Sequence, residues 1–514
     1  MRFTRHNLLL PLAAAALILS ACGTTNDTSG SASPTIERGA PAPTRAESAA
    51  HMLSDADVSL TPAPCDLDVP DTATCGVAEV PSDWSSPDSE TTEVFYALLP
   101  ARTGPSDGTV IPFMGGPGES ITDVIGLFVP FSDAVVDRDI LIVDVRGAGR
   151  SGALTCLVLD EATEFASGDA QVRQIGECGQ QLGAQRNHYT TVASVLDIEA
   201  IRRSLDLAPP SLIGFSYGTW MAQVYTQLFP EVVQGAVLDG AFPLDQDPWA
   251  ADVPNSFKTV LELRCERTGA CPNGAPAVAA EIRAVAAALA AQPVDLADSA
   301  QDLTEGVFAS ILQFSLQGED FASLVTTVES AASGDYEMLS AVASEALRIP
   351  AHGTSVVSPA LSAAVSCNDY VAPFDLSDDG ATRRADYEDG LDELPADAFG
   401  WISNAGWMGS AWEQGDMCLD WPTPDIAAAL RVPSGEDRPD VPVLVVNGDI
   451  DLQTPLLGAK KVAASYPNGV LVVVPNAAHV AFPVSDCAAA LETAFLLDPV
   501  LPAADACAHA PIPE

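Results

Sequence analysis

A serine placed between two glycines is the first feature of this sequence that could do chemistry. Residues 211–220 read SLIGFSYGTW, so Ser216 stands in a G-x-S-x-G pattern with Gly214 and Gly218. The pattern lies where a short apolar run gives way to helical spacing, and its glycines permit a sharp strand-to-helix turn that a Cβ would obstruct. Such a turn exposes a serine hydroxyl as a nucleophile. An ordinary turn is the competing interpretation, because short patterns of common residues also arise by chance.

A serine nucleophile needs a base to take its proton and an acid to orient that base. In enzymes built on this turn, the acid and then the base follow the nucleophile in the chain, each in a loop after a late strand. The sequence holds six histidines. Of these, His479 in LVVVPNAAHVAF follows a late strand-like run, whereas His509 lies in a Pro- and Ala-rich tail. We therefore predict His479 as the base.

The acid is expected in the loop that follows the preceding strand. The stretch VPVLVVNGDIDLQTP offers both Asp449 and Asp451 there. A buried carboxylate at this place accepts the imidazole N–H, fixes the tautomer and stabilises the imidazolium. Either aspartate could instead form an Asx turn at the strand end. The residues alone leave the two equally eligible.

Two backbone N–H groups are needed to stabilise the oxyanion of a tetrahedral intermediate. One is expected from Tyr217, directly after the nucleophile, and the other from a loop after an early strand. The stretch PFMGGPGES follows the apolar run 109–113, and its Gly115 and Gly116 let the backbone approach a ligand closely. We predict this loop as the second half of an oxyanion hole.

Strand-like and helix-like segments alternate around these residues. We predict strands at 94–99, 109–113, 140–145, 211–214, 233–238, 441–446 and 470–474, and helices at 192–205, 217–229 and 487–497. Ala-rich helical segments at 277–291, 304–315 and 336–346 interrupt the alternation. We therefore expect one core domain with a mostly parallel sheet covered on both faces, formed by residues 60–250 and 431–514, and an inserted helical cap at 251–430.

The first 22 residues have the pattern of a secretory signal peptide, with two arginines followed by the apolar run 8–19. Their ending, LSAC, resembles the lipobox of bacterial lipoproteins, which implies cleavage before Cys22 and acylation of its thiol. Residues 23–59 begin with a Gly/Ser/Thr/Pro-rich stretch, and we predict a flexible tether. We expect an exported protein that the lipid alone holds on the outer face of the cell membrane.

Cysteine usage supports export, because eleven cysteines less Cys22 leave ten, an even number suited to an oxidising compartment. We predict five bridges between near neighbours, namely Cys65 with Cys75, Cys156 with Cys178, Cys265 with Cys271, Cys367 with Cys418, and Cys487 with Cys507. The sequence has no C-x-x-C pair or His/Cys cluster, so we expect no metal site.

The charge balance narrows the choice of partners. Seventy acidic against 23 basic residues give a net charge of −47. Such a surface repels nucleic acid and anionic lipid headgroups, so we expect no nucleic-acid partner. With 47% hydrophobic and 18% charged residues the chain is globular rather than disordered.

A set of motifs carries a family resemblance. It consists of GGPGES (115–120), DVRGAGRSG (144–152), GFSYGT (214–219), VLDG (237–240), CLDWP (418–422), GDIDLQTP (448–455) and His479. Together they resemble the α/β-hydrolase peptidases related to proline iminopeptidase, and within these the secreted actinobacterial tripeptidyl-aminopeptidase-like proteins. The likeness covers roughly residues 60–510. It implies an α/β-hydrolase fold with an inserted helical cap and chemistry without a cofactor.

The resemblance also implies roles for single residues. It makes Ser216 the nucleophile and His479 the base, and its pattern G-x-x-D-x-x-T-P selects Asp451 as the acid over Asp449. It implies that Gly116 supplies the second oxyanion donor.

Family members hydrolyse short peptides from a free N-terminus, with acidic residues binding the ammonium group. Glu119, where the family usually has a small residue, and Asp369 are the candidates for that task here. A second departure is Ala478 before the histidine, where the family has glycine.

The leading hypothesis is a serine exopeptidase that releases an amino acid to a tripeptide from the N-terminus of short peptides. An esterase or another acyl hydrolase with the same triad is the alternative, which a requirement for a free α-amine separates from the first. A third possibility is a lipoprotein that binds peptides without catalysis. The sequence predicts neither the preferred residue at the scissile bond nor the oligomeric state.

Overall fold

The computed structural model describes residues 43–162, 164, 166–297, 299–348, 357–410 and 415–509. The predicted signal peptide, its lipidation site Cys22 and most of the predicted tether lie outside these residues.

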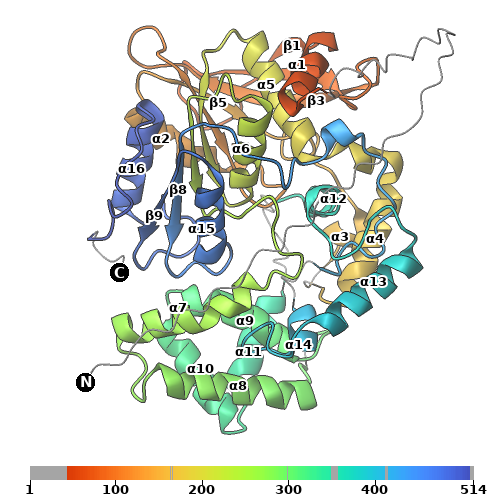
Figure 1. Cartoon of the computed structure of the whole chain (residues 1–514), viewed down its shortest axis with the longest axis vertical. Coiled ribbons are helices and arrows are strands. Elements are labelled where there is room, and N and C mark those ends of the chain that lie inside the picture. The colour runs from red at the N-terminus through yellow and green to blue at the C-terminus, as the bar shows by residue number, and fades with distance from the viewer. Residues whose placement is uncertain are drawn as a thin grey trace, which may run out of the picture. The chain divides into compact units, whose positions relative to one another are not determined.

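A sheet of nine strands forms the centre of the described fold (Figure 1). Its strands are β1 (Ser59–Ala63), β2 (Thr74–Pro81), β3 (Thr91–Leu99), β4 (Thr109–Phe113), β5 (Asp139–Val143), β6 (Pro210–Phe215), β7 (Gly235–Asp239), β8 (Val443–Gly448) and β9 (Gly469–Val474). The spatial order is β1-β2-β3-β5-β4-β6-β7-β8-β9. The pairs from β1 to β5 are antiparallel, and those from β5 to β9 are parallel. The mostly parallel sheet and all the predicted strands are confirmed.

Burial explains which strands the sequence revealed. Every residue of β4, β6, β7 and β8 is buried, as in strands that helices cover on both faces. Such strands read as short, continuous apolar runs. By contrast, β1 at the sheet edge has no buried residue and contains Pro62, which an edge strand tolerates. Neither β1 nor β2 is among the predicted strands.

Helices cover both faces of the sheet and also form a cap. They are α1 (Arg45–Asp55), α2 (Phe128–Ala134), α3 (Leu157–Asp160), α4 (Asp169–Leu182), α5 (Thr191–Ser204), α6 (Tyr217–Leu228), α7 (Asp252–Thr268), α8 (Ala275–Ala291), α9 (Glu305–Gln317), α10 (Phe321–Ala332), α11 (Glu337–Leu347), α12 (Pro359–Asp369), α13 (Gly380–Glu393), α14 (Asn404–Met408), α15 (Leu456–Ser465) and α16 (Asp486–Leu497), with 3-10 helices η1 (Thr122–Leu127), η2 (Gly183–His188) and η3 (Ala428–Leu430). Apolar side chains of α1, α5, α6 and α15 form the first core on one face. Those of η1, α2 and α16 form the second core on the other face.

Helices α7 to α11 and α14 share a separate apolar core and form the cap (Figure 1). Ile450 and Leu452, from the loop after β8, belong to this cap core. The predicted cap boundaries at 251–430 are wrong in one respect, because α12 packs into the first core of the sheet instead. Its run of buried Ala, Leu and Val side chains suits that core, and the Cys367–Cys418 disulfide ties it to a second segment packed there.

The prediction that the tether extends to residue 59 is also wrong. Helix α1 begins at Arg45, and Thr44 caps it in a capping box with Glu47. Ala49 of this helix is fully buried in the first core. The T-x-x-E start and this apolar contact explain why a helix forms where composition alone indicated a flexible segment.

All five predicted disulfides are present, between Cys65 and Cys75, Cys156 and Cys178, Cys265 and Cys271, Cys367 and Cys418, and Cys487 and Cys507. Within the described part of the chain, no helix has the length and apolar character needed to cross a membrane.

Candidate active site

Ser216 stands at the tip of a sharp turn between β6 and α6, as the G-x-S-x-G pattern predicts. Its φ of +53° lies in the left-handed region, which few residues other than glycine adopt. A Cβ on Gly214 would lie 2.2 Å from the carbonyl oxygen of Gly218, and one on Gly218 would lie 2.2 Å from that of Phe113. Both positions therefore admit glycine alone, and β4 packs directly behind the turn.

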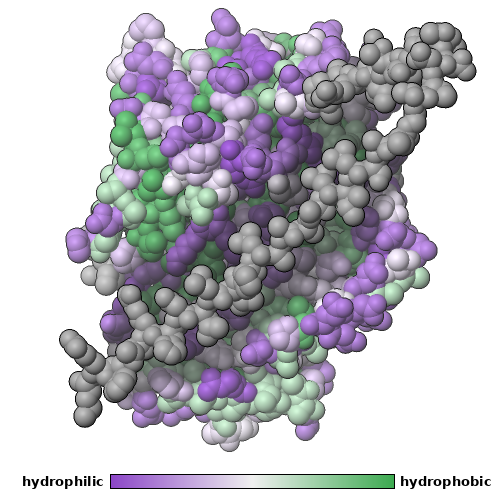
Figure 2. Space-filling model, viewed as in Figure 1, coloured by the Kyte–Doolittle hydropathy of each residue, from purple (hydrophilic) through white to green (hydrophobic). Residues whose placement is uncertain are grey.

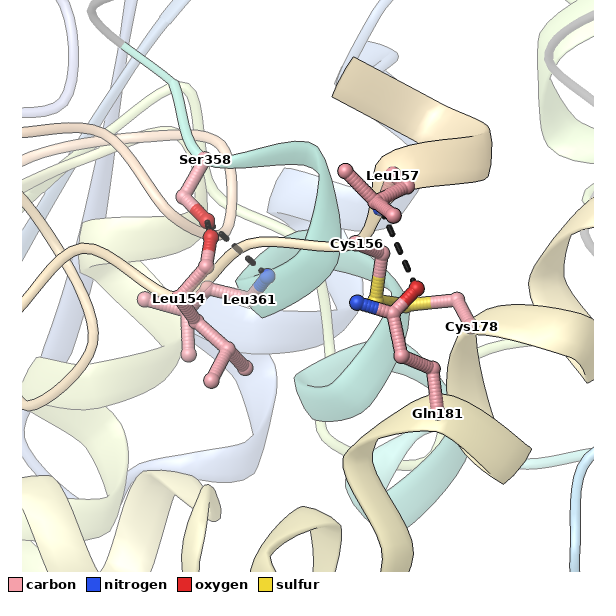
Figure 3. Close-up of a disulfide and its surroundings, with 7 residues drawn as sticks. All are labelled: Leu154, Cys156, Leu157, Cys178, Gln181, Ser358 and Leu361. Atoms are coloured by element: carbon pink, nitrogen blue, oxygen red, sulfur yellow. Dashed lines mark hydrogen bonds between the residues drawn. A yellow bond between two sulfur atoms is a disulfide. The ribbon is translucent and has the colours of Figure 1, made fainter. Parts of the chain in front are cut away.

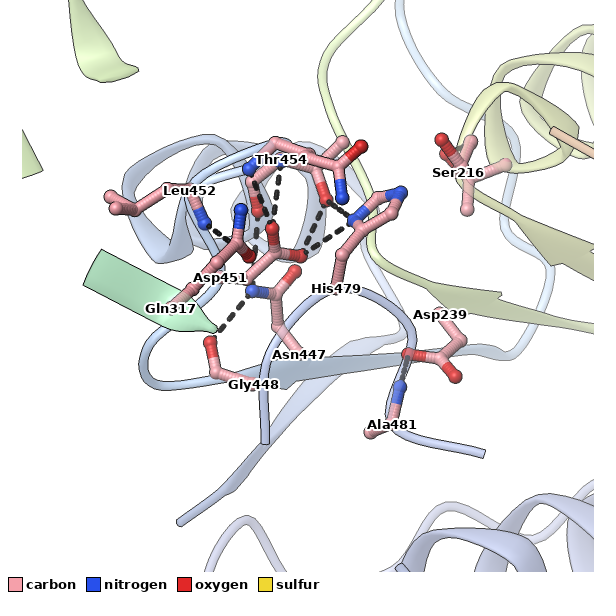
Figure 4. A network of polar contacts seen from close by, with 12 residues as sticks. Ser216, Asp239, Gln317, Asn447, Gly448, Asp451, Leu452, Thr454, His479 and Ala481 are labelled. Carbon is pink, nitrogen blue, oxygen red and sulfur yellow. Dashed lines mark hydrogen bonds and ion pairs between the residues drawn. The ribbon is translucent and has the colours of Figure 1, made fainter. Parts of the chain in front are cut away.

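His479 lies in the loop after β9 and faces an acid on one side and Ser216 on the other (Figure 4). Its Nδ1 is 3.0 Å from Oδ2 of Asp451 and 3.1 Å from Oγ of Thr454. The opposite edge of the imidazole ring is directed toward Ser216 in Figure 4. The chain thus brings the three predicted side chains together in the order needed to pass a proton from the serine to the histidine.

Asp451 is 2% exposed and is held by the turn that follows β8. Its Oδ1 accepts the N–H groups of Gln453 and Thr454, at 2.8 and 2.9 Å. Its Oδ2 accepts the hydroxyl of Thr454 at 2.7 Å and is the oxygen that faces His479. These contacts fix the carboxylate in the position from which it can orient the imidazole.

Asp449, the other eligible aspartate, has a different task. Its Oδ1 accepts from Nη1 of Arg267 at 2.8 Å, its Oδ2 accepts from Nη2 of the same guanidinium, and the N–H of Asn476 donates to Oδ1 at 2.7 Å. The ion pair joins α7 of the cap to the loop after β8. Of the two aspartates, only Asp451 contacts His479, which agrees with the choice implied by the family pattern.

The surroundings of His479 stabilise its protonated form. Burial lowers the pKa of His479, but the charge and hydrogen bond of Asp451 and the charges of Asp239 and Glu119 outweigh burial and raise it above the ordinary value. A base must be neutral to accept the serine proton. Catalysis by this histidine therefore increases as the pH rises through its pKa.

The two parts of the predicted oxyanion hole lie beside Ser216. Tyr217 is the first residue of α6, so its N–H is among the amides that a helix N-terminus leaves free. Gly116 has a φ of +103° and lines the same cavity as Ser216. A Cβ on the neighbouring Gly115 would lie 3.2 Å from the Cβ of Ser216, which places this loop against the nucleophile. The N–H of Gly115 donates to Oε2 of Glu119 at 2.9 Å, so Gly116 remains the better donor candidate.

Asp144, at the carboxyl end of β5, anchors the oxyanion loop. It accepts the N–H and hydroxyl of Thr122, at 3.1 and 2.6 Å, and the hydroxyl of Ser120 at 3.2 Å. The N–H of Arg150 also donates to it, at 2.8 Å. The loop is therefore braced just after its glycines, which explains why DVRGAGRSG accompanies GGPGES in the sequence.

The two predicted ammonium candidates have different surroundings. Glu119 lines the cavity beside the nucleophile, where burial raises its pKa, while the N–H of Gly115 and the charge of His479 oppose that rise. Asp369 is not among the cavity-lining residues. Its Oδ2 accepts the N–H and hydroxyl of Thr191, at 2.6 and 2.7 Å, at the start of α5. The prediction that Asp369 binds substrate is therefore wrong, because its carboxylate is directed into the protein at a helix N-terminus.

A cavity of about 1670 Å³ surrounds Ser216 and His479, and both core and cap line it. The cap contributes apolar side chains of α9 and α11, among them Ile311, Phe314 and Leu347. The described lining contains four carboxylates, those of Glu119, Asp160, Glu161 and Glu164, and no lysine or arginine. Hydrophilic residues cover much of the outer face seen in Figure 2.

A disulfide holds the acidic part of the cavity wall. Cys156, just before α3, is bonded to Cys178 of α4, and the side-chain oxygen of Gln181 accepts the N–H of Leu157 at 3.1 Å (Figure 3). Ser358 caps α12 and donates its hydroxyl to the carbonyl of Leu154 at 2.6 Å. The segment that carries Asp160, Glu161 and Glu164 is thus attached to both α4 and α12.

Sequence reasoning missed a buried carboxylate next to the histidine. Asp239, at the end of β7, accepts the N–H groups of Ala481 and Phe482, at 2.9 and 2.8 Å (Figure 4). Burial raises the pKa of Asp239 to about 6, although those two N–H groups lower it. Asp239 holds the loop that presents His479. The VLDG motif, which contains Asp239, is among the motifs that carry the family resemblance, and it could have indicated this aspartate. The resemblance implied no role for it.

A second missed feature is the brace between the cap and the acid loop. Gln313 of α9 donates its side-chain amide to the carbonyl of Leu452 at 3.0 Å, and Gln317 accepts the Leu452 N–H at 3.3 Å. Both glutamines are buried. No local pattern indicates these two glutamines, because contacts between a cap helix and a distant loop depend on the tertiary fold.

Comparisons with known proteins agree with this geometry. The family described as alpha/beta hydrolase fold matches residues 108–271, and the family described as TAP-like protein matches residues 404–507. The serine protease Hip1 of Mycobacterium tuberculosis is 29% identical over 238 residues, which are 42% of this chain and 46% of that protein. The tripeptidyl aminopeptidase of Streptomyces lividans is 27% identical over 208 residues, 35% of this chain and 38% of that protein.

The proline iminopeptidase of Neisseria gonorrhoeae is 30% identical over 143 residues, which are 27% of this chain and 35% of that protein. The chain thus matches less than half the length of each of these relatives. The nucleophile turn and the oxyanion loop fall within the first matched family region, and Asp451 and His479 fall within the second. The chain therefore has the α/β-hydrolase fold and is related to the TAP-like proteins, among whose similar sequences are a tripeptidyl aminopeptidase and a proline iminopeptidase.

Proposed function

We propose that the protein is a serine exopeptidase that releases short fragments from the free N-terminus of peptides. Ser216 Oγ attacks the scissile carbonyl while His479 takes its proton, and Asp451 stabilises the resulting imidazolium. The N–H groups of Tyr217 and Gly116 bind the oxyanion of the tetrahedral intermediate. His479 then protonates the leaving amine, and water hydrolyses the acyl-enzyme by the same route in reverse.

The negative charge of the cavity is the observation that supports a substrate with a free N-terminus. Its described lining combines four carboxylates with no lysine or arginine, in an otherwise largely apolar enclosure. An ammonium group gains from such surroundings, whereas a substrate carboxylate would be repelled. The names of the similar tripeptidyl aminopeptidase and proline iminopeptidase agree with this preference.

The position of the carboxylates bears on the length of the released fragment. Glu119 lies against the oxyanion loop, so an ammonium bound there would belong to the residue whose carbonyl is attacked. Asp160 and Glu161 are exposed and come from α3 and the residue after it. An ammonium bound to them would leave room for further residues before the scissile bond. Because Glu119 already accepts the Gly115 N–H and burial raises its pKa, we favour the exposed pair and a fragment longer than one residue.

A panel of chromogenic substrates tests the proposal. It contains aminoacyl, prolyl and tripeptidyl anilides with a free amine, their N-acetyl counterparts, and short-chain nitrophenyl esters. We expect cleavage of the free-amine tripeptidyl anilide and at least about tenfold less cleavage of its N-acetyl counterpart, because acetylation removes the ammonium charge and also places an apolar acetyl group against the carboxylates of the cavity wall. Equal cleavage of both anilides, or cleavage of the esters alone, would instead favour an esterase or another acyl hydrolase.

The panel also separates the two ammonium candidates. Glu161→Gln should lower kcat/KM for the tripeptidyl anilide and spare the aminoacyl anilide. Glu119→Gln keeps an oxygen that accepts the Gly115 N–H and serves as the matched variant next to the nucleophile. The opposite pattern would assign the ammonium group to Glu119.

We further propose that the protein is exported. The five disulfides are consistent with an oxidising compartment. Acylation of Cys22 and attachment to the outer face of the cell membrane remain predictions from the sequence. Metabolic labelling with a fatty acid, compared between the natural chain and Cys22→Ser, tests them.

A further inference from the structure

Four phenylalanine rings form a continuous wall on one side of the cavity. Phe128 and Phe215 have ring centroids 6.4 Å apart, Phe215 and Phe482 are 5.8 Å apart, and Phe482 and Phe131 are 5.8 Å apart. All four rings line the cavity that contains Ser216 and His479. We call this set the aromatic wall.

The aromatic wall lies next to the reacting groups. Phe215 directly precedes Ser216, and Phe482 follows His479 in the loop after β9. Asp239 holds the Phe482 N–H, so the same carboxylate that fixes the histidine loop also fixes this part of the wall. Phe128, Phe131 and Phe215 are at most 8% exposed, which gives the wall a rigid base.

The aromatic wall and the acidic part of the cavity stand on different sides of the nucleophile. Three rings of the wall belong to the second core, which packs η1, α2 and α16 on one face of the sheet. Cys156 and Ile175, which support the acidic segment, belong to the first core on the opposite face. A peptide whose ammonium group is at the acidic side therefore runs past Ser216 toward the aromatic wall.

The chemistry of the leaving group identifies which residue of the substrate meets the wall. His479 must protonate the amine that leaves, so that amine faces the imidazole. The side chain of the first residue after the scissile bond then lies beside the loop that follows His479. We propose that the aromatic wall is the binding pocket for that side chain and selects apolar and aromatic residues; this inference rests on the proposed function.

The aromatic wall would distinguish substrate side chains by the free energy of removing them from water. Neither a charged nor a hydrogen-bonding side chain is among its four members, so a polar substrate side chain would lose hydration there without compensation. A phenyl or isobutyl group buries apolar surface against the rings. A contact of that kind is worth about tenfold or more in kcat/KM.

Partitioning of the acyl-enzyme between water and added amines tests the pocket. The acyl-enzyme is formed from a free-amine tripeptidyl nitrophenyl ester, and phenylalaninamide, leucinamide, glycinamide or lysinamide competes with water for it. We expect phenylalaninamide and leucinamide to capture the acyl group at least about tenfold better than glycinamide and lysinamide, because the amine that enters takes the place of the amine that leaves. Equal capture of all four amides by the natural protein would overturn the proposal.

Matched variants attribute the preference to the wall. Phe131→Ala and Phe482→Ala should bring the ratio of phenylalaninamide to glycinamide capture close to one. Phe374→Ala is the control, since Phe374 is 8% exposed and is not among the described cavity-lining residues, and should keep the ratio of the natural protein. A ratio unchanged in both wall variants would overturn the proposal. Near-ultraviolet circular dichroism of each variant shows whether its fold is intact.

A binding measurement keeps the pocket testable if no acyl-enzyme forms. Absence of any nitrophenol release from the free-amine tripeptidyl ester would contradict the proposed function. Calorimetric titration of Ser216→Ala with phenylalaninamide and with glycinamide would then test the pocket by itself. Tighter binding of phenylalaninamide supports it, and equal binding of the two amides overturns it.

Discussion

Replacing each of the two aspartates after β8 by asparagine, one at a time, distinguishes the catalytic acid Asp451 from its neighbour Asp449. In Asp451→Asn, the amide oxygen is expected to remain at the Oδ1 position, because two backbone N–H groups donate there. The amide NH2 group then takes the place of Oδ2, which faces Nδ1 of His479. Nδ1 becomes an acceptor, the ring proton moves to the nitrogen that faces Ser216, and the histidine can no longer take the serine proton. Loss of the right tautomer lowers kcat by about 10⁴-fold in a triad of this kind.

Asp449→Asn supplies the matched control in the same loop. Here the NH2 group would meet Nη2 of Arg267, and two donors would face each other across a contact whose side chains are 13% and 19% exposed. We expect a loss of about 1–3 kcal/mol in the free energy of unfolding, with kcat changed by less than about threefold.

The assay is kcat for the free-amine tripeptidyl anilide, measured beside thermal unfolding of each variant. The expected result is a slow but stable Asp451→Asn variant and an active but less stable Asp449→Asn variant. An Asp451→Asn variant that keeps more than a tenth of the natural kcat, or an Asp449→Asn variant that loses as much kcat as Asp451→Asn, would refute the assignment.

Three further predictions concern buried groups around the site. Asp239→Asn should lower kcat by about 10- to 100-fold, because the variant loses one acceptor for the histidine loop. It should also shift the pH profile of kcat/KM to lower pH, because it loses a charge that raises the pKa of His479. An unshifted profile in a titration from pH 4 to 9 would contradict this. Burial raises the pKa of Asp369 from 3.8 to about 7, so the folded state holds a proton that the unfolded chain releases, and this contribution to stability is present below pH 3.8 and lost as the pH rises to about 7. It amounts to at most about 4 kcal/mol, and Asp369→Asn should therefore unfold at a temperature that depends less on pH between 4 and 7 than the natural protein does; parallel curves would count against it. Gly218→Ala should fail to fold or lose more than about 3 kcal/mol in the free energy of unfolding, because its Cβ would lie 2.2 Å from a β4 carbonyl oxygen. Soluble protein with natural thermal stability would disprove the close packing of the turn.

The sequence could predict those parts of the fold that local patterns determine. Buried parallel strands appear as short apolar runs, and the turn at Ser216 needs glycine at two positions that a motif can reveal. Cysteine pairs close in sequence could be matched by proximity alone, and all five were right.

The sequence could not predict features that depend on contacts between distant segments. The choice between Asp449 and Asp451 depends on Arg267, which lies in the cap and pairs with one of them. Asp369 was misassigned because nothing in its local sequence reveals that Thr191 binds its carboxylate. Asp239 supports the histidine loop from a strand more than 200 residues away, and the aromatic wall gathers rings from α2, β6 and the loop after β9.

Trapping of the acyl-enzyme tests the central proposal most directly. The protein is mixed with a free-amine tripeptidyl nitrophenyl ester, quenched in acid within milliseconds and digested, and the peptides are analysed by mass spectrometry. We predict a tripeptidyl adduct on Ser216, absent from Ser216→Ala and at least about tenfold weaker with the N-acetyl ester. An adduct on another residue, or equal adducts from the free and acetylated esters, would contradict a serine exopeptidase that acts through Ser216.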